Sequence, residues 1–81
     1  MRLVLVEWVD SFGCAPDWRP LDGCAPDLLV CRSVGWLLHE DERCLVVVPH
    51  RTDGGAVEPQ GCGDMTIPRV AVLRVLPLEE P

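Results

Sequence analysis

The chain has 81 residues, of which 48 % are hydrophobic, and a net charge of −6 with no lysine. This length suits a single small domain, which buries roughly 60–65 % of its surface and has a thin stability margin. The acidic balance and the scattered arginines disfavour a nucleic-acid binder, and no apolar run approaches the roughly 18 residues of a membrane span.

The N-terminal segment RLVLVEWV, residues 2–9, predicts a strand because it is short and rich in β-branched residues. Both faces of this strand are apolar, with Val4 and Val6 on one side and Leu3 and Leu5 on the other. The segment has a single arginine and no small-residue cleavage site, so we expect no secretion signal and a cytoplasmic location.

Residues 10–27 predict a long loop, because three prolines, two glycines and four aspartates break any apolar periodicity. This loop contains GCAPDW and, ten residues later, GCAPDL, which we interpret as a duplication in a tolerant surface loop.

Cys14 and Cys24 can form a disulfide across the repeat. The five cysteines contain no pair at the two-to-four-residue spacing of zinc knuckles, so we expect no metal and no cofactor.

Two strands joined by an acidic hairpin turn follow: LLVCRSVGWLLH at 28–39, EDER at 40–43 and CLVVVPH at 44–50. Gly35 inside a strand indicates a sharp bend or a close backbone contact, and Pro49 ends the third strand or places it at a sheet edge. His39 and Glu40 are interpreted as a solvated strand end.

The rest of the chain predicts a second loop at 51–64 and a brief strand at 65–68. A single turn at 68–71 and a last strand at 72–78 follow. No segment has the pattern of a long helix. Five short strands with a 3₁₀ turn before the last one predict an all-β fold, a small five-stranded SH3-like barrel with two long loops. The barrel spans residues 1–81 as one domain.

The segments that carry this layout are VEWVDS at 6–11, SVGWLL at 33–38, VVVPHRTD at 46–53 and MTIPRVAV at 65–72. In this pattern the chain resembles a family of small SH3-like barrel proteins encoded by phages and prophages. The resemblance implies a small β-barrel, a mobile-element origin and a bacterial host cell as the location. It implies no reaction.

The polar cluster His50-Arg51-Thr52-Asp53 leaves a strand end and enters a Gly-rich loop, a place where binding groups often lie. Arg51 can clamp a carboxylate or phosphate, with Thr52 donating a second hydrogen bond. In the alternative interpretation, Asp53 caps its own turn and Arg51 is solvated. Arg69 is a second candidate for holding an anion.

A hydrolase triad of Ser11, His50 and Asp53 is disfavoured, because DSFG is not the strained turn that presents a nucleophilic serine. We therefore expect no enzymatic activity.

Trp8 and Trp36 lie on apolar strand faces and are predicted to be core residues. Trp18 lies in the polar loop, where it either folds over the barrel as a lid, which we favour, or anchors a partner.

The apolar character of both strand faces predicts self-association, because one barrel hides only one of them. We expect a non-enzymatic binding protein that forms a homodimer or higher oligomer. It would engage a host protein or an anionic signalling nucleotide, held by Arg51 or Arg69, in an accessory or counter-defence role. The alternative is a small-barrel nucleic-acid-binding adaptor, which the net charge disfavours.

Overall fold

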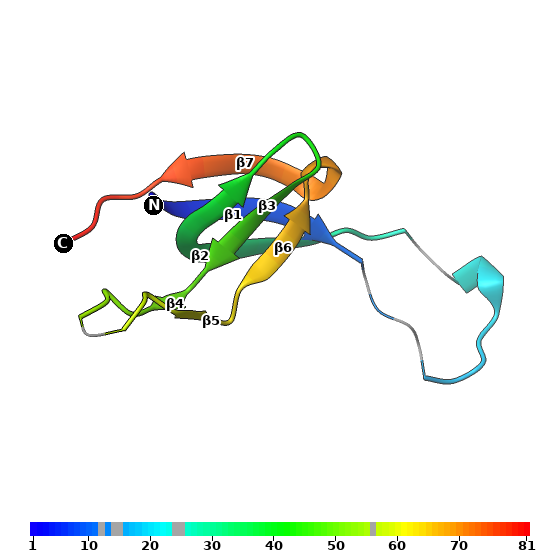
Figure 1. The fold of residues 1–81 in the computed structure, drawn as a ribbon. Coiled ribbons are helices and arrows are strands. Elements are labelled where there is room, and N and C mark those ends of the chain that lie inside the picture. Colours follow the sequence, from blue (N-terminus) through cyan, green and yellow to red (C-terminus); the bar gives the residue numbers. More distant parts are fainter. Residues whose placement is uncertain (12, 14–15, 24–25, 56) are drawn as a thin grey trace.

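The computed structural model describes residues 1–11, 13, 16–23, 26–55 and 57–81. Its elements in chain order are β1 (Leu3–Asp10), the 3₁₀ turn η1 (Leu21–Gly23), β2 (Leu29–Glu40), β3 (Cys44–Val48), β4 (His50–Arg51), β5 (Gly61–Cys62), β6 (Met65–Pro68), the 3₁₀ turn η2 (Arg69–Ala71) and β7 (Val72–Pro77). The described residues contain no α-helix, so the fold is all-β as predicted (Figure 1). Within those residues, no helix is long and apolar enough to cross a membrane.

Five strands form one antiparallel sheet in the order β6-β3-β2-β1-β7, and η2 precedes β7 as predicted. The long strand β2 belongs to both halves of this sheet, since it pairs with β1 up to Trp36 and with β3 from Trp36 onward. In the part of the chain that the structure describes, the edge strands β6 and β7 do not pair with each other, so the sheet does not close. The short strands β4 and β5 form a separate hairpin, in which β4 takes the last residue of the predicted third strand and the first of the predicted second loop, and β5 lies within that loop.

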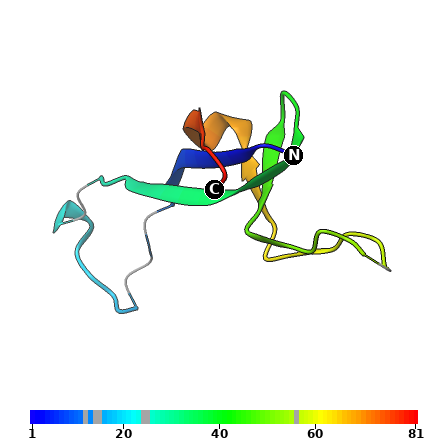
Figure 2. The same cartoon turned by 90° about the vertical axis from the view of Figure 1, so that its left-hand side faces the viewer.

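β2 bends, as Figures 1 and 2 show, and Gly35 lies next to Trp36, at which β2 passes from pairing with β1 to pairing with β3. A Cβ atom on Gly35 would lie 2.9 Å from the carbonyl oxygen of Val48. Only glycine fits this approach without a shift of the neighbouring backbone. The predicted close backbone contact at Gly35 is therefore confirmed, and β3 ends at Val48, directly before Pro49.

The core lies between the two halves of the curved sheet. Its fully buried cluster consists of Val4, Val6, Leu45, Val47 and Ile67. Trp8, which was predicted to be a core residue, packs against this cluster from β1. Val4 and Val6 therefore form the inward face of β1, whereas Leu3 and Leu5 lie on its opposite face.

The prediction for Trp36 is wrong: this half-buried side chain lies on the side of β2 that faces away from the core. The lid prediction for Trp18 is also wrong, because its side chain is fully exposed. Residues 16–23, the main described part of the loop between β1 and β2, lie away from the sheet and do not fold over it (Figures 1 and 2). The molecule is accordingly elongated, measuring 58 × 26 × 24 Å. Cys14 and Cys24, with their possible disulfide, lie outside the described residues.

Candidate functional site

A pocket of about 520 Å³ lies beside the β4–β5 hairpin. Its walls combine the apolar side chains of Leu38, Val48 and Pro59 with polar ones, including Arg51, Thr52, Asp53 and Asp64. Three of the four residues of the predicted polar cluster, Arg51, Thr52 and Asp53, therefore come together in one concave site. Mixed apolar and polar walls of this kind are typical of ligand pockets.

Thr52 has a structural role in the hairpin that forms the pocket. Its backbone N–H donates to the carbonyl oxygen of Gln60 at 2.8 Å, and its Oγ1 accepts from the backbone N–H of Gln60 at 2.8 Å. Beyond Thr52, Gly54 and Gly55 turn the chain with φ values of 95° and 104°, which other residues rarely adopt. The Thr52 hydroxyl thus fastens the hairpin.

Arg51 is already surrounded by partners inside the protein. Its guanidinium lies 4.6 Å from the centre of the Trp36 ring, as in a cation–π contact. It also lies 3.6 Å from a carboxylate oxygen of Asp53 and 3.9 Å from one of Glu80, while the Trp36 indole N–H donates to Glu80 at 3.0 Å. An anionic ligand would have to compete with these two carboxylates for Arg51.

The other predicted site residues do not line the pocket. His50 lies opposite Cys62 in the β4–β5 ladder, with an exposed side chain. Arg69 begins η2, where its guanidinium lies 3.4 Å from a carboxylate oxygen of Glu40. Trp18 lies on the loop between β1 and β2, residues 11–28, which we call the projecting loop. Ser11 follows β1 at the base of that loop, at the end of the sheet away from β4 (Figure 1).

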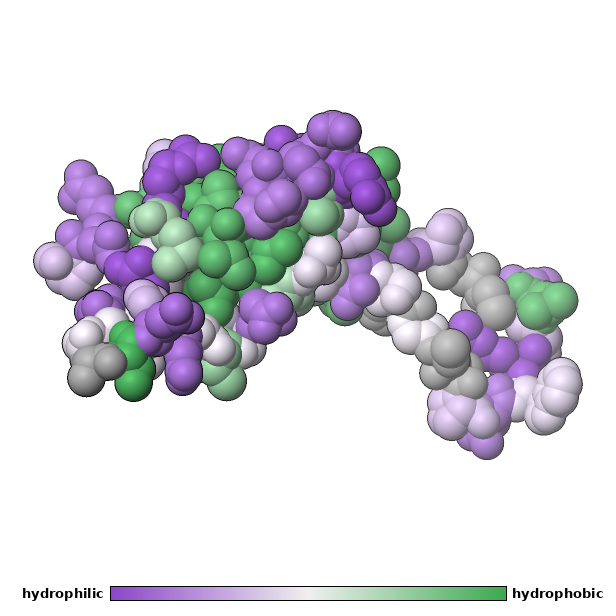
Figure 3. All heavy atoms as spheres, viewed as in Figure 1, coloured by the Kyte–Doolittle hydropathy of each residue, from purple (hydrophilic) through white to green (hydrophobic). Residues whose placement is uncertain are grey.

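A second surface feature is the apolar side of β1, β2 and β7 that faces away from the core. We call it the outer face, and its apolar residues are Leu3, Leu5, Val9, Val30, Val34, Trp36 and Leu76. Leu5 lies between Val34 of β2 and Leu76 of β7, so the apolar side chains are neighbours across three strands. Val30 and Val34 are 55 % and 51 % exposed. Figure 3 is drawn from another side, with β3 and β6 in front, and hydrophobic side chains reach the surface there as well.

A cluster of three charges lies in the middle of the outer face. Glu7, whose side chain is only 12 % exposed, accepts a hydrogen bond from Arg74 of β7 and one of 2.9 Å from Arg32 of β2. The hydrogen bond from Arg74 lowers the pKa of Glu7, and the bond from Arg32 adds to this effect. Two arginines around one carboxylate leave this part of an acidic protein locally positive.

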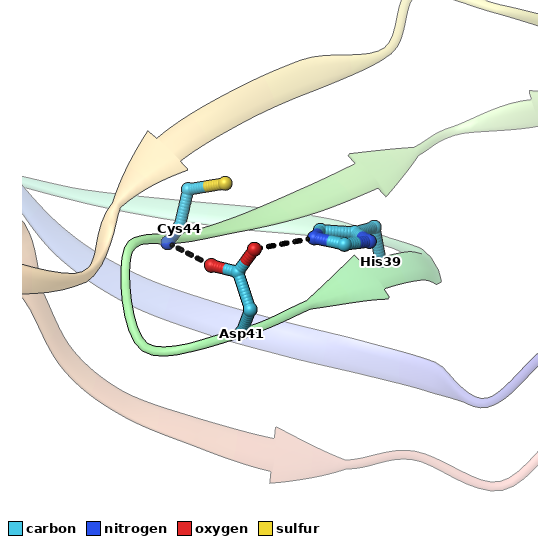
Figure 4. A group of neighbouring side chains, drawn as sticks. All are labelled: His39, Asp41 and Cys44. Atoms are coloured by element: carbon cyan, nitrogen blue, oxygen red, sulfur yellow. Dashed lines mark hydrogen bonds and ion pairs between the residues drawn. The ribbon is translucent and has the colours of Figure 1, made fainter.

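A third feature lies at the turn between β2 and β3, where His39, Asp41 and Cys44 face one another (Figure 4). The Asp41 carboxylate lies 2.8 Å from His39 Nε2, and its other oxygen accepts from the backbone N–H groups of Arg43 at 2.7 Å and Cys44 at 2.9 Å. These hydrogen bonds, led by the one from His39, lower the pKa of Asp41 to about 2. This group is not apparent from the sequence, because the five cysteines lack the spacing of a zinc knuckle and His39 has the position of a solvated strand end.

The signal that would have found the group is the pattern H-x-D-x-x-C across a two-stranded turn, since the turn brings the first and last positions together. The pocket, the outer face and the His39–Asp41–Cys44 group are the three candidate sites of the described residues. Comparison of the chain with protein-family models, with curated proteins and with solved structures gave no match.

Proposed function

We propose that the chain is a non-enzymatic binding protein of phage or prophage origin that works as a homodimer and engages a host protein. The outer face is the observation that carries this proposal. Val30 and Val34 are about half exposed; Val34 lies in one row with Leu5 and Leu76, and Val30 lies beside Val9. Full burial of an exposed valine contributes on the order of 1.5–3 kcal/mol, so burying the exposed half of each of these side chains contributes roughly half of that, and a two-fold pair buries the same face on both copies.

The projecting loop supplies a chemical match for this face. Trp18 and Leu21 of the loop are exposed apolar side chains, and Asp17 and Asp22 beside them are acidic. The outer face offers apolar side chains around two arginines. Because the loop points away from its own sheet, it suits the outer face of a second copy, and a reciprocal exchange would cover both loops and both faces.

An SH3-like arrangement is the finer description that we propose for the fold. The strand order β6-β3-β2-β1-β7 and the 3₁₀ turn before the last strand support it. So does the sharp bend of β2, which lets one strand serve both halves of the sheet around a common core.

The pocket supports a protein segment as the bound partner more than an anionic nucleotide. Among its side chains the lining carries two carboxylates, Asp53 and Asp64, and one cationic group, Arg51. The guanidinium of Arg51 is already within ion-pair distance of Asp53 and Glu80. A peptide segment with an apolar side chain for Leu38 and Val48 and a basic group for the carboxylates fits these walls better than a phosphate.

Light scattering coupled to size-exclusion chromatography tests the homodimer. We expect the wild-type protein to elute at twice the 9.0 kDa mass of one chain. Val34→Glu places a charge in the outer face and is expected to give a folded monomer. Val70→Glu is the matched control, because Val70 is 98 % exposed in η2, away from that face, and it should remain dimeric. A monomeric wild-type protein, or a dimer that Val34→Glu leaves intact, would contradict the proposal.

A further inference from the structure

We propose that His39, Asp41 and Cys44 form a binding site for a divalent transition-metal ion of the zinc class. Each residue offers one ligand atom, and these atoms all lie within 4.8 Å of one another. Imidazole nitrogen, carboxylate oxygen and thiolate sulfur are the three donor types that zinc takes from proteins. This inference goes beyond the proposed function and does not rest on it.

The turn holds one ligand in place before any metal arrives. One carboxylate oxygen of Asp41 is fixed by the N–H groups of Arg43 and Cys44, and the backbone N–H of Asp41 donates to the Cys44 carbonyl at 3.0 Å. The second carboxylate oxygen is therefore turned toward His39, as Figure 4 shows. Outer hydrogen bonds of this kind orient metal-binding carboxylates and histidines in proteins.

The ligand atoms can close around an ion by side-chain rotation. Zinc bonds of about 2.0–2.3 Å place two tetrahedral ligand atoms about 3.4–3.6 Å apart. His39 Nε2 and the Asp41 oxygen, now 2.8 Å apart, need to separate slightly, whereas the Cys44 sulfur needs to approach. The ion would replace the hydrogen bond between His39 and Asp41.

The charge balance of the site suits a dication. The carboxylate of Asp41 supplies one negative charge. Binding through sulfur converts the Cys44 thiol to a thiolate and releases that proton to solvent. The neighbouring carboxylate of Glu40 is engaged with Arg2 and Arg69, so the fourth coordination position is left to water or to a group of another molecule.

Cobalt(II) titration tests the site, because a thiolate ligand on cobalt gives a charge-transfer absorption and tetrahedral coordination gives intense d–d bands. The measurement uses reduced protein carrying Cys14→Ser, Cys24→Ser and Cys62→Ser, so that Cys31 and Cys44 are its only thiols. We expect one equivalent of cobalt to produce both signals, and zinc to displace it. Cys44→Ser should abolish the charge-transfer band, and His39→Gln should weaken binding at least about tenfold.

Cys31→Ser on the same background is the matched control and should keep the full spectrum, since Cys31 lies on β2 outside the group. Neither His39→Gln nor Cys44→Ser removes the Asp41 hydrogen bonds that fasten the turn, so both variants should stay folded by circular dichroism. The proposal is overturned if cobalt gives no thiolate band, or if the band survives Cys44→Ser. Loss of the band in Cys31→Ser would overturn it as well.

Discussion

Asp41 is the residue that defines the tight turn between β2 and β3. It accepts hydrogen bonds from two backbone N–H groups and faces His39. An aspartate that bonds to the backbone two and three residues ahead stabilises a turn while keeping its charge. The same contacts lower the pKa of Asp41 to about 2 from its ordinary 3.8, which ties the stability of the turn to pH.

We expect Asp41→Asn to reduce the acid sensitivity of the fold. Because the folded pKa lies below the unfolded one, the contribution of Asp41 is full above the ordinary value of 3.8 and is lost as the pH falls toward about 2. Urea unfolding at about pH 5 and about pH 2 measures this loss. Asp41→Asn should be less stable than wild type at the higher pH and should lose less on acidification.

Asp22→Asn is the charge-matched control for this prediction, because Asp22 lies in η1 on the projecting loop. It should keep the wild-type difference between the two pH values. An acid loss in Asp41→Asn equal to that of the wild type would show that the turn contacts do not carry the effect.

At the level of the elements, Gly35 lets β2 serve both halves of the sheet. Gly35→Ala is expected to destabilise the protein by about 1–3 kcal/mol, because the new Cβ would press on the backbone of β3. The contact in question is 2.9 Å from the Val48 oxygen. The midpoint of chemical unfolding measures the change.

Gly13→Ala supplies the control, since a Cβ there would meet nothing within 4 Å. It should change the stability by less than about 0.5 kcal/mol. Equal effects of the two substitutions would mean that the bend tolerates a side chain at Gly35.

The strands of the sheet could be predicted because short apolar runs rich in β-branched residues mark them directly in the sequence. The short strands β4 and β5 could not, since two residues carry no periodicity. The sequence pattern also could not predict which face of a strand is buried, because both faces are apolar. Trp36 was assigned to the core for this reason, although it lies on the outer face under Arg51.

In the candidate sites, too, the local sequence predicts some features and only the folded structure reveals others. Arg51, Thr52 and Asp53 are adjacent in the sequence at a strand end, so their shared position in the pocket could be predicted. The partners of Arg51 could not be, because Trp36 and Glu80 reach it only through the folded sheet and the C-terminal segment. Arg69 was chosen for its charge and Trp18 as an aromatic residue in a polar loop, and the structure places neither at the pocket.

For the molecule as a whole, we expect the projecting loop to contribute little to the stability of the sheet, because its described residues 16–23 are exposed. Trp18 is fully exposed, so Trp18→Ala should leave the unfolding free energy of a monomer within about 0.5 kcal/mol of its original value. In the dimer that we propose, the same substitution removes an aromatic anchor and should weaken association at least about tenfold. Sedimentation at a series of concentrations measures this.

Monomer stability is measured in the Val34→Glu background, where association should be absent. A Trp18→Ala variant that lowers monomer stability would mean that the indole packs on its own sheet. One that associates as tightly as the wild type would mean that the loop is not part of the dimer contact.

The position of β1 has a consequence for synthesis on the ribosome. β1 is synthesised before β7, one of its two neighbours in the sheet, and Leu78 beyond β7 also bonds to Leu3. Until β7 emerges from the ribosome and pairs with β1, one side of β1 offers unpaired backbone groups. Such an edge pairs readily with other chains, so the nascent protein is most prone to aggregation in the interval before β7 pairs with β1.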